Sequence, residues 1–129
     1  MKKFFVIGNP ITHSLSPRLH NHWFKINDIN AVYEKKLLES KDLPNLFKKI
    51  KSNEIDGINI TTPFKNEVLP FLDEMSMEAT KTKSVNTVYL DDNKIIGHNT
   101  DIAGFELALR FIKYDVSKKK VVILGAGGV

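Results

Sequence analysis

The stretch GINITTPFK, residues 57–65, combines a half-polar strand with the start of a helix and a single lysine. Side chains two residues apart on a strand share a face, so the two isoleucines point one way while Asn59 and Thr61 point the other. We expect the isoleucines to pack against helices and the polar pair to lie near the carboxyl end of the strand. The next helix is predicted to begin at Pro63, which places Lys65 in its first turn.

Strand-like and helix-like segments alternate around this stretch. Strands are predicted at residues 4–8, 31–38, 56–61, 85–90, 94–97 and 121–124. Helices are predicted from residue 16 and at residues 40–51, 63–72, 76–82 and 102–112, with a disturbance at Pro70 in the third of these. This alternation predicts an α/β fold with a mostly parallel sheet and helices on both faces, whose ligands bind beyond the carboxyl ends of the strands.

The first helix has a clear expected start and an expected apolar face. Ser16 is predicted to be its N-cap, with Pro17 at the first helical position. Leu19, Trp23 and Ile26 follow at helical spacing and are expected to face the core.

Composition excludes several classes of function. The 129 residues are 42% hydrophobic and 26% charged, with a net charge of +4 and no cysteine, which excludes disulfides and thiolate sites. The lysine clusters at 48–51 and 118–120 lack interleaved aromatics, so no nucleic-acid partner is expected. The apolar run near the N-terminus is shorter than a signal sequence, and no segment approaches the ~20 apolar residues of a membrane span. We therefore expect a soluble, cytoplasmic protein.

Lys65 and Asp101 are the candidate proton-transfer pair. A helix N-terminus favours acids by ~0.3–1 kcal/mol, so a lysine there is either a tolerated surface residue or a functional one. Asp101, just before the predicted helix at 102–112, is either an N-cap or the partner of Lys65. Near Lys65 it would favour the ammonium form and oppose the helix dipole, an arrangement suited to reversible proton transfer.

Other polar residues have both a structural and a functional interpretation. Ser14 and Ser16 at a helix start could hold a carboxylate, or simply cap the helix. Asn86, in an otherwise apolar strand, either satisfies backbone groups or binds a polyol. The four histidines lack the spacing of a zinc site, so no metal is expected.

The C-terminal stretch resembles the opening of a dinucleotide-binding fingerprint. A buried strand at 121–124 runs into a glycine-rich turn, while the following helix and the residues that select NADP over NAD are outside the sequence. The turn consists of Gly125, Ala126, Gly127, Gly128 and Val129. Hydride transfer by a dinucleotide together with proton transfer by a lysine is alcohol–ketone oxidoreduction.

Together these segments resemble the shikimate dehydrogenases. The motifs, in that family's order, are GNP at 8–10 with SLSP at 14–17, NITTPFK at 59–65, SVNT at 84–87, GHNTD at 97–101 and GAGG at 125–128. The resemblance implies reversible reduction of 3-dehydroshikimate to shikimate with NADPH, on the route to aromatic amino acids. Quinate/shikimate dehydrogenase and a non-catalytic shikimate-binding domain are the alternatives.

The resemblance also implies a role for each matching residue. Lys65 and Asp101 match the family's catalytic pair and also contact substrate. Ser14 and Ser16 match the serines that hold the substrate carboxylate. Asn59, Thr61 and Asn86 match the groups that bind its hydroxyls. The glycine-rich turn at 125–129 matches the loop that binds NADP. His98 stands where the family often has an acid, and nothing is inferred from that difference.

The resemblance divides the chain into three parts. Residues 1–100 match a substrate-binding and catalytic domain, 101–116 a connecting helix and linker, and 117–129 the first strand and glycine-rich turn of an NADP-binding domain. The family's chain is about twice as long, and helices beyond its nucleotide-binding domain return a glutamine to the substrate. The 129 residues alone are therefore expected to be inactive and not to bind NADPH. The strand at 121–124 is expected to seek a partner, which includes self-association.

Overall fold

The structure, a computed structural model, describes residues 1–125 and residue 127. Its strands are β1 (Lys2–Gly8), β2 (Ala31–Leu37), β3 (Gly57–Ile60), β4 (Glu74–Met75), β5 (Thr87–Asp91) and β6 (Lys94–His98). Its helices are α1 (Ser16–Ile26), α2 (Leu43–Lys51), α3 (Met77–Thr82) and α4 (Asp101–Phe111), with the short 3-10 helices η1 (Ser40–Asp42) and η2 (Leu69–Phe71).

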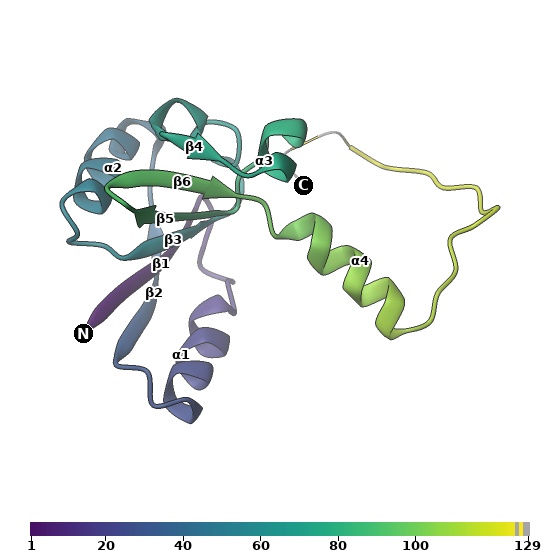
Figure 1. Cartoon of the computed structure of the whole chain (residues 1–129), viewed down its shortest axis with the longest axis horizontal. Helices are drawn as coiled ribbons and strands as arrows, with labels where there is room; N and C mark the ends of the chain where they lie inside the picture. Colours follow the sequence, from purple (N-terminus) through teal and green to yellow (C-terminus); the bar gives the residue numbers. More distant parts are fainter. Residues whose placement is uncertain (126, 128–129) are drawn as a thin grey trace.

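The strands form one six-stranded sheet in the order β2-β1-β3-β5-β6-β4. Strands β2, β1 and β3 are mutually parallel, as are β4 and β6, whereas β5 is antiparallel to both its neighbours. The hairpin between β5 and β6 turns at Asp92 and Asn93, which have φ of 43° and 59°, as a tight two-residue turn requires. The predicted α/β class is confirmed, and the hairpin makes the sheet mixed (Figure 1).

Helices cover both faces of the sheet, and alternation along β1 sorts its side chains between them. Ile7 belongs to the main core beneath α2, whereas Val6 belongs to a smaller cluster with Phe4 and Phe24 of α1. Neighbouring strands keep this alternation, since Val6 is in register with Asn59 of β3. The face that carries Val6 therefore also carries the polar side chain of the predicted site.

The predicted apolar face of α1 is wrong. Leu19, Trp23 and Ile26 are 46%, 46% and 61% exposed, and none of them is in the core. His20 faces inward instead and stacks on the ring of Tyr33, with centroids 4.2 Å apart and planes at 7°. Partial burial lowers the pKa of His20 below its ordinary value.

The reason for this rotation is that β2 is an edge strand, whose outward backbone groups need partners. Asn21 of α1 supplies them: its Nδ2 donates to the Tyr33 carbonyl at 2.7 Å, and its Oδ1 accepts from the Tyr33 N–H at 2.9 Å. The periodicity of apolar residues did not predict which face of α1 is buried, because an amide on a different face pairs with the sheet edge.

The helix predicted at 63–72 does not form. The segment is a series of turns that ends in η2. The carbonyl of Lys65 accepts from the N–H of Val85 at 2.9 Å, so it bonds to another segment instead of to the next helical turn. Pro70 has no N–H to continue a helix. Tertiary hydrogen bonding and the proline together replace the helix with turns.

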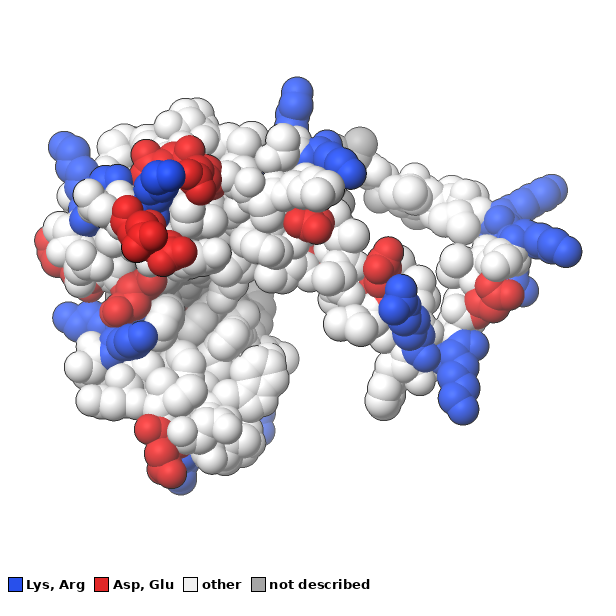
Figure 2. All heavy atoms as spheres, in the orientation of Figure 1, with Lys and Arg blue, Asp and Glu red and all other residues white. Residues whose placement is uncertain are grey.

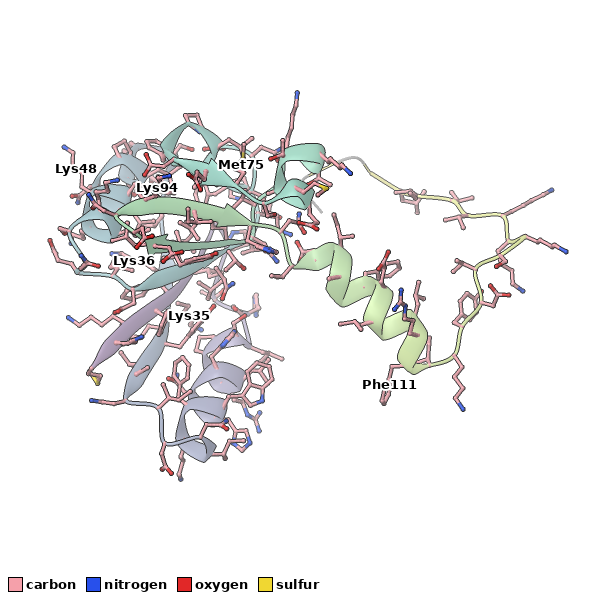
Figure 3. The ribbon with its side chains drawn as sticks, viewed as in Figure 1. Lys35, Lys36, Lys48, Met75, Lys94 and Phe111 are labelled. Carbon is pink, nitrogen blue, oxygen red and sulfur yellow. The ribbon has the colours of Figure 1, made fainter. Side chains whose placement is uncertain are left out.

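Helix α4 leaves the sheet domain at the end of β6 and extends away from it (Figure 1). It has no buried residue, and Phe111 at its far end points away from the sheet (Figure 3). The strand predicted at 121–124 is also wrong: this segment is highly exposed and pairs with no strand among residues 1–125. A strand needs a neighbour for its backbone hydrogen bonds, and no described strand lies against it.

Basic and acidic side chains are interspersed over the face shown in Figure 2, without a continuous field of one sign. None of the helices within the described ranges has the length and apolarity needed to cross a bilayer.

Candidate functional site

An ion pair between buried Lys65 and partly exposed Asp101 is the centre of the candidate site. Lys65 is 9% exposed, and its Nζ lies 2.8 Å from Oδ2 of Asp101, the first residue of α4. Because no helix begins at Pro63, the predicted opposition between a helix dipole and Asp101 is absent. Among the described residues, the Asp101 carboxylate is the ion-pair partner of the Lys65 ammonium.

Asn99 leaves the Asp101 carboxylate free for that contact. The Asn99 Oδ1 accepts from the backbone N–H groups of Asp101 at 3.0 Å and of Ile102 at 3.4 Å. It thereby satisfies N–H groups at the helix start that otherwise have no partner. The interpretation of Asp101 as an N-cap is therefore wrong, because the side chain that caps α4 is Asn99.

Asn86 holds the other side of the carboxylate. Its Nδ2 donates to Oδ1 of Asp101 at 2.9 Å and to the Thr100 hydroxyl at 2.8 Å, while its Oδ1 accepts from the Thr100 N–H at 3.0 Å. The structural interpretation of Asn86, that it satisfies a backbone group, is confirmed. The same side chain also fixes the orientation of Asp101, since each carboxylate oxygen now has a separate donor.

A chain of hydrogen bonds continues from Asn86 across the sheet. Asn59 Nδ2 donates to the Thr87 hydroxyl at 3.0 Å and to the Asn86 carbonyl at 3.2 Å. The Tyr33 hydroxyl donates to Asn59 Oδ1 at 2.6 Å. Burial raises the pKa of Tyr33 well above its ordinary value, and a hydrogen bond with Ser16 offsets part of that rise.

Tyr33 is a site residue that the sequence reasoning missed. It is 3% exposed and contacts both Asn59 and Ser16, so it connects two groups of predicted residues. The signal in the sequence was Tyr33 itself, an aromatic residue with a hydroxyl on a predicted strand. A buried hydroxyl at such a position needs a partner on the neighbouring strands.

The two serines lie at the other end of the site, beside a pocket of about 330 Å³. It is lined by Val6, Pro10, Ile11, His13, Ser14, Ser16 and Thr61. The Ser14 hydroxyl accepts from the Ser16 N–H at 3.3 Å, whereas the N-cap position is Leu15, without a side-chain cap. The predicted N-cap role of Ser16 is therefore wrong. Its hydroxyl faces Tyr33 instead.

The structure thus brings the predicted residues onto one side of the sheet in two groups. Ser14, Ser16 and Thr61 line the pocket, and Asn59, Asn86, Asp101 and Lys65 form the hydrogen-bond network, with Tyr33 between the groups. His13, considered in the sequence only as a metal ligand, also lines the pocket. Within the described part of the chain, no cluster of three His, Cys, Asp or Glu could hold a metal.

The predicted cofactor residues are only partly described. Gly125 has a φ of +107°, a conformation that favours glycine, and neither Gly125 nor Gly127 has a neighbour within 4 Å of where a Cβ would lie. Ala126, Gly128 and Val129 lie outside the described residues. Their assignment to a phosphate-binding turn stays a prediction.

Both the sequence and the structure of the chain are similar to those of known proteins. A family model for the "Shikimate dehydrogenase substrate binding domain" matches residues 6–88. A curated relative, the NADP(+) shikimate dehydrogenase of Pelagibacter ubique, is 57% identical over 99% of this chain and 48% of its own length.

Solved structures agree with the sequence match. The shikimate dehydrogenase 1 of Peptoclostridium difficile superposes with a TM-score of 0.93 at 36% identity, over 99% of this chain and 47% of the other. A Thermus thermophilus shikimate 5-dehydrogenase solved in complex with shikimate gives a TM-score of 0.91 at 35% identity, over 99% and 49%. The chain therefore spans about half the length of the relatives it matches.

Proposed function

The chain belongs to the shikimate dehydrogenase substrate-binding domain family, and we propose that it supplies the substrate site and the proton-transfer pair of an NADP-dependent shikimate dehydrogenase. The reaction is the reversible reduction of 3-dehydroshikimate to shikimate. The observation that carries the proposal is the buried contact between Lys65 Nζ and Asp101 Oδ2 at 2.8 Å. A buried ammonium is costly unless it is paired, and Asp101 supplies the partner.

The proposed role of Lys65 follows from its hydrogen-bonding capacity. Ketone reduction adds a hydride to the carbonyl carbon and a proton to its oxygen; NADPH, when bound, supplies the hydride. An ammonium has three N–H donors, and Asp101 takes one of them, which leaves two for a substrate oxygen. Lys65 then gives its proton to that oxygen, and in the reverse direction the neutral amine takes the proton back.

Asp101 acts by orienting this lysine. Its two carboxylate oxygens are held separately, by Lys65 on one side and by Asn86 on the other. A carboxylate fixed in this way keeps the ammonium in one place, which favours the aligned geometry that proton transfer requires. Once Lys65 has lost its proton, Asp101 can also accept a hydrogen bond from a substrate hydroxyl.

The remaining predicted residues are proposed to hold the substrate. The hydroxyls of Ser14 and Ser16 lie beside the helix start, where a carboxylate is favoured by free N–H groups and the helix dipole. Thr61 lines the same pocket, and Asn59 and Asn86 extend the polar surface toward Lys65. A ring with a carboxylate at one end and hydroxyls at the other fits this order of groups.

For the cofactor, we propose that the glycine-rich turn at 125–129 contacts NADP. The left-handed φ of Gly125 and the open space at both described glycines fit a turn whose backbone a phosphate can approach. The described residues supply only the beginning of such a site, because a phosphate cradle also needs N–H groups from a following helix.

The test is a lysine substitution in purified protein that carries this chain, assayed with shikimate and NADP⁺. Lys65→Met should lower kcat by ~10²–10⁴-fold, the usual worth of a positioned proton donor, with a much smaller change in KM. Lys81→Met, an exposed lysine of α3, removes the same charge and should leave kcat unchanged. Unchanged turnover in the Lys65 variant would exclude its proposed role.

The alternatives give different outcomes in the same protein. A non-catalytic binding domain would bind shikimate in a calorimeter but show no turnover at any NADP⁺ concentration. A quinate/shikimate enzyme would show comparable kcat/KM for quinate and shikimate, whereas a strict shikimate dehydrogenase would not. The complete Asn59-to-Lys65 motif favours shikimate.

A further inference from the structure

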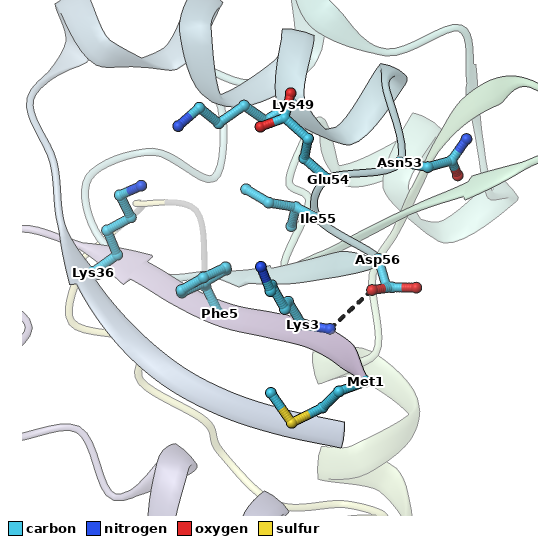
Figure 4. Close-up of a pocket in the computed structure, with 9 residues that line it drawn as sticks. All are labelled: Met1, Lys3, Phe5, Lys36, Lys49, Asn53, Glu54, Ile55 and Asp56. Carbon is cyan, nitrogen blue, oxygen red and sulfur yellow. Dashed lines mark hydrogen bonds between the residues drawn. The ribbon is translucent and has the colours of Figure 1, made fainter. Parts of the chain in front are cut away.

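A second pocket lies on the other face of β1 from the candidate site, beneath α2 (Figure 4). Its volume is about 370 Å³, and it is lined by Met1, Lys3, Phe5, Lys36, Lys49, Asn53, Glu54, Ile55 and Asp56. A smaller pocket of about 190 Å³ adjoins it and shares Lys36 and Lys49. The sheet separates this groove from the substrate pocket, because Phe5 and Val6 point to opposite faces of β1.

Two of the three lysines that line this groove, Lys36 and Lys49, are unusual in the chain. Of all the lysines, which fall within residues 1–120, only Lys36, Lys49 and Lys65 are not largely exposed. Lys65 has Asp101 as its partner, whereas the ammonium groups of Lys36 and Lys49 make no ion pair with any described carboxylate. A lysine with a partly buried side chain and no carboxylate partner can bind an anion beside it.

The carboxylates that line the groove already have partners. Asp56 Oδ2 accepts from the backbone N–H of Lys3 at 2.8 Å, the dashed line in Figure 4. Glu54 Oε1 accepts from the Ser52 hydroxyl at 2.9 Å. Neither carboxylate lies within ion-pair distance of Lys36 or Lys49. Lys36 and Lys49 therefore have no carboxylate partner among the residues that line the groove.

The floor between the lysines is apolar. Phe5 is half-buried, Ile55 is buried, and the Lys36 Nζ lies 5.6 Å from the centroid of the Phe5 ring. Because Lys36 lies over the face of Phe5, a flat ring can pack against the ring edge while the ammonium groups hold an anionic substituent. The volume also lies in the range of small-molecule sites, roughly 300–1,000 Å³.

We propose that this groove is a second ligand site, for a small aromatic anion: a ring against the edge of Phe5 with its phosphate or carboxylate group between Lys36 and Lys49. The site is separate from substrate binding and does not depend on the function proposed above. Phosphate and carboxylate share the chemistry that these lysines recognise, and two probes, phenyl phosphate and benzoate, distinguish them.

The experiment titrates each probe into the chain in the presence of saturating shikimate and follows backbone amide shifts by NMR. Shifts are expected at Phe5, Glu54 and Ile55, around the groove. The double variant Lys36→Ser with Lys49→Ser should weaken binding by about tenfold or more, since each ion contact to an anion contributes of order 1 kcal/mol. Phe5→Leu should weaken phenyl phosphate but not inorganic phosphate.

A matched control removes the same charge elsewhere. Lys25→Ser with Lys48→Ser changes two exposed lysines, one of them adjacent in sequence to Lys49, and should bind both probes as the unmodified chain does. Equal losses in the two double variants would reduce the effect to net charge and overturn the site. Inorganic phosphate binding as tightly as phenyl phosphate, or shifts centred on Ser14 and Thr61, would also overturn it.

Discussion

Helices α2 and α4 were predicted from the same kind of apolar spacing, yet their environments are opposite. Helix α2 buries four side chains, at Leu43, Leu46, Phe47 and Ile50, whereas α4 buries none. Both helices form, so the spacing is sufficient to predict a helix. It does not predict what covers the apolar face, because that depends on whether a sheet lies beneath the helix.

The two helices are also held in different ways. Helix α2 rests on the face of the sheet where Ile7, Ile58 and Val88 complete the core. Helix α4 is held at its first turn by the polar contacts of Asn99, Asn86 and Lys65. One helix is therefore part of the cooperative core, and the other extends from it by a polar connection that also builds the candidate site.

The largest expected effect tests this contrast with a matched pair of truncations. Phe47 is 4% exposed and stacks on Phe71 at 4.8 Å between centroids, so Phe47→Ala should lower the free energy of unfolding by ~3–5 kcal/mol. Phe111 in α4 is 88% exposed, and Phe111→Ala should change the free energy of unfolding by no more than ~0.5 kcal/mol.

Urea denaturation of the chain, followed by tryptophan fluorescence and circular dichroism, measures both free energies. Phe47→Leu, which keeps much of the apolar volume but loses the stacking on Phe71, serves as the conservative control and should recover part of the loss. A large destabilisation by Phe111→Ala would mean that α4 packs against the sheet in solution, and the contrast between the two helices would be lost.

A smaller effect concerns the glycine within α4. Nothing lies within 4 Å of a Cβ built at Gly104, so an added methyl group meets no obstacle. Gly104→Ala should stabilise α4 by ~1 kcal/mol through helix propensity alone, without changing the unfolding of the sheet domain. Amide hydrogen exchange distinguishes the stability of α4 from that of the sheet domain, and slower exchange is expected only across residues 101–111. Faster exchange in that range would contradict an open surface at Gly104.

The smallest effect is a pH dependence that differs between the sheet and the segment after α4. The backbone N–H of Ile95, and then Lys51, lower the pKa of Asp73. A carboxyl whose pKa is lowered on folding stabilises the fold above its unfolded pKa, and this stabilisation is lost as the pH falls through the folded pKa. Asp73→Asn should therefore flatten the acid side of the stability profile.

Asp115 provides the matched comparison. Its pKa is also lowered, but by the hydroxyl and N–H of Ser117, two residues away in an exposed segment. The sign of the linkage is the same, yet it acts only on the local turn. Asp115→Asn should leave the acid unfolding midpoint of the sheet domain unchanged, as measured by fluorescence between neutral pH and pH ~2. A shift equal to that of Asp73→Asn would show that the two segments unfold together.

The direction of side chains along the central strand was more predictable than the contacts of the helices. Alternation in the segment around Asn59 predicted which side chains face the core and which face the site, because the period of a strand is fixed. The helix at 63–72 failed because the Lys65 carbonyl bonds to Val85, a contact that no local pattern contains. Likewise Tyr33 was missed because its role depends on its distance from Asn59 and Ser16, on other elements.

The sequence by itself determined the α/β class, the polar face of β3 and the residue types needed at the site, since these follow from short-range periodicity and the chemistry of side chains. Only the tertiary structure decided that Lys65 and Asp101, 36 residues apart, lie 2.8 Å from each other. It also decided that α1 turns its apolar stripe outward, because the edge of β2 needed the amide of Asn21. Hydrogen bonds between distant segments depend on which elements become neighbours, and that is settled only when the whole chain packs.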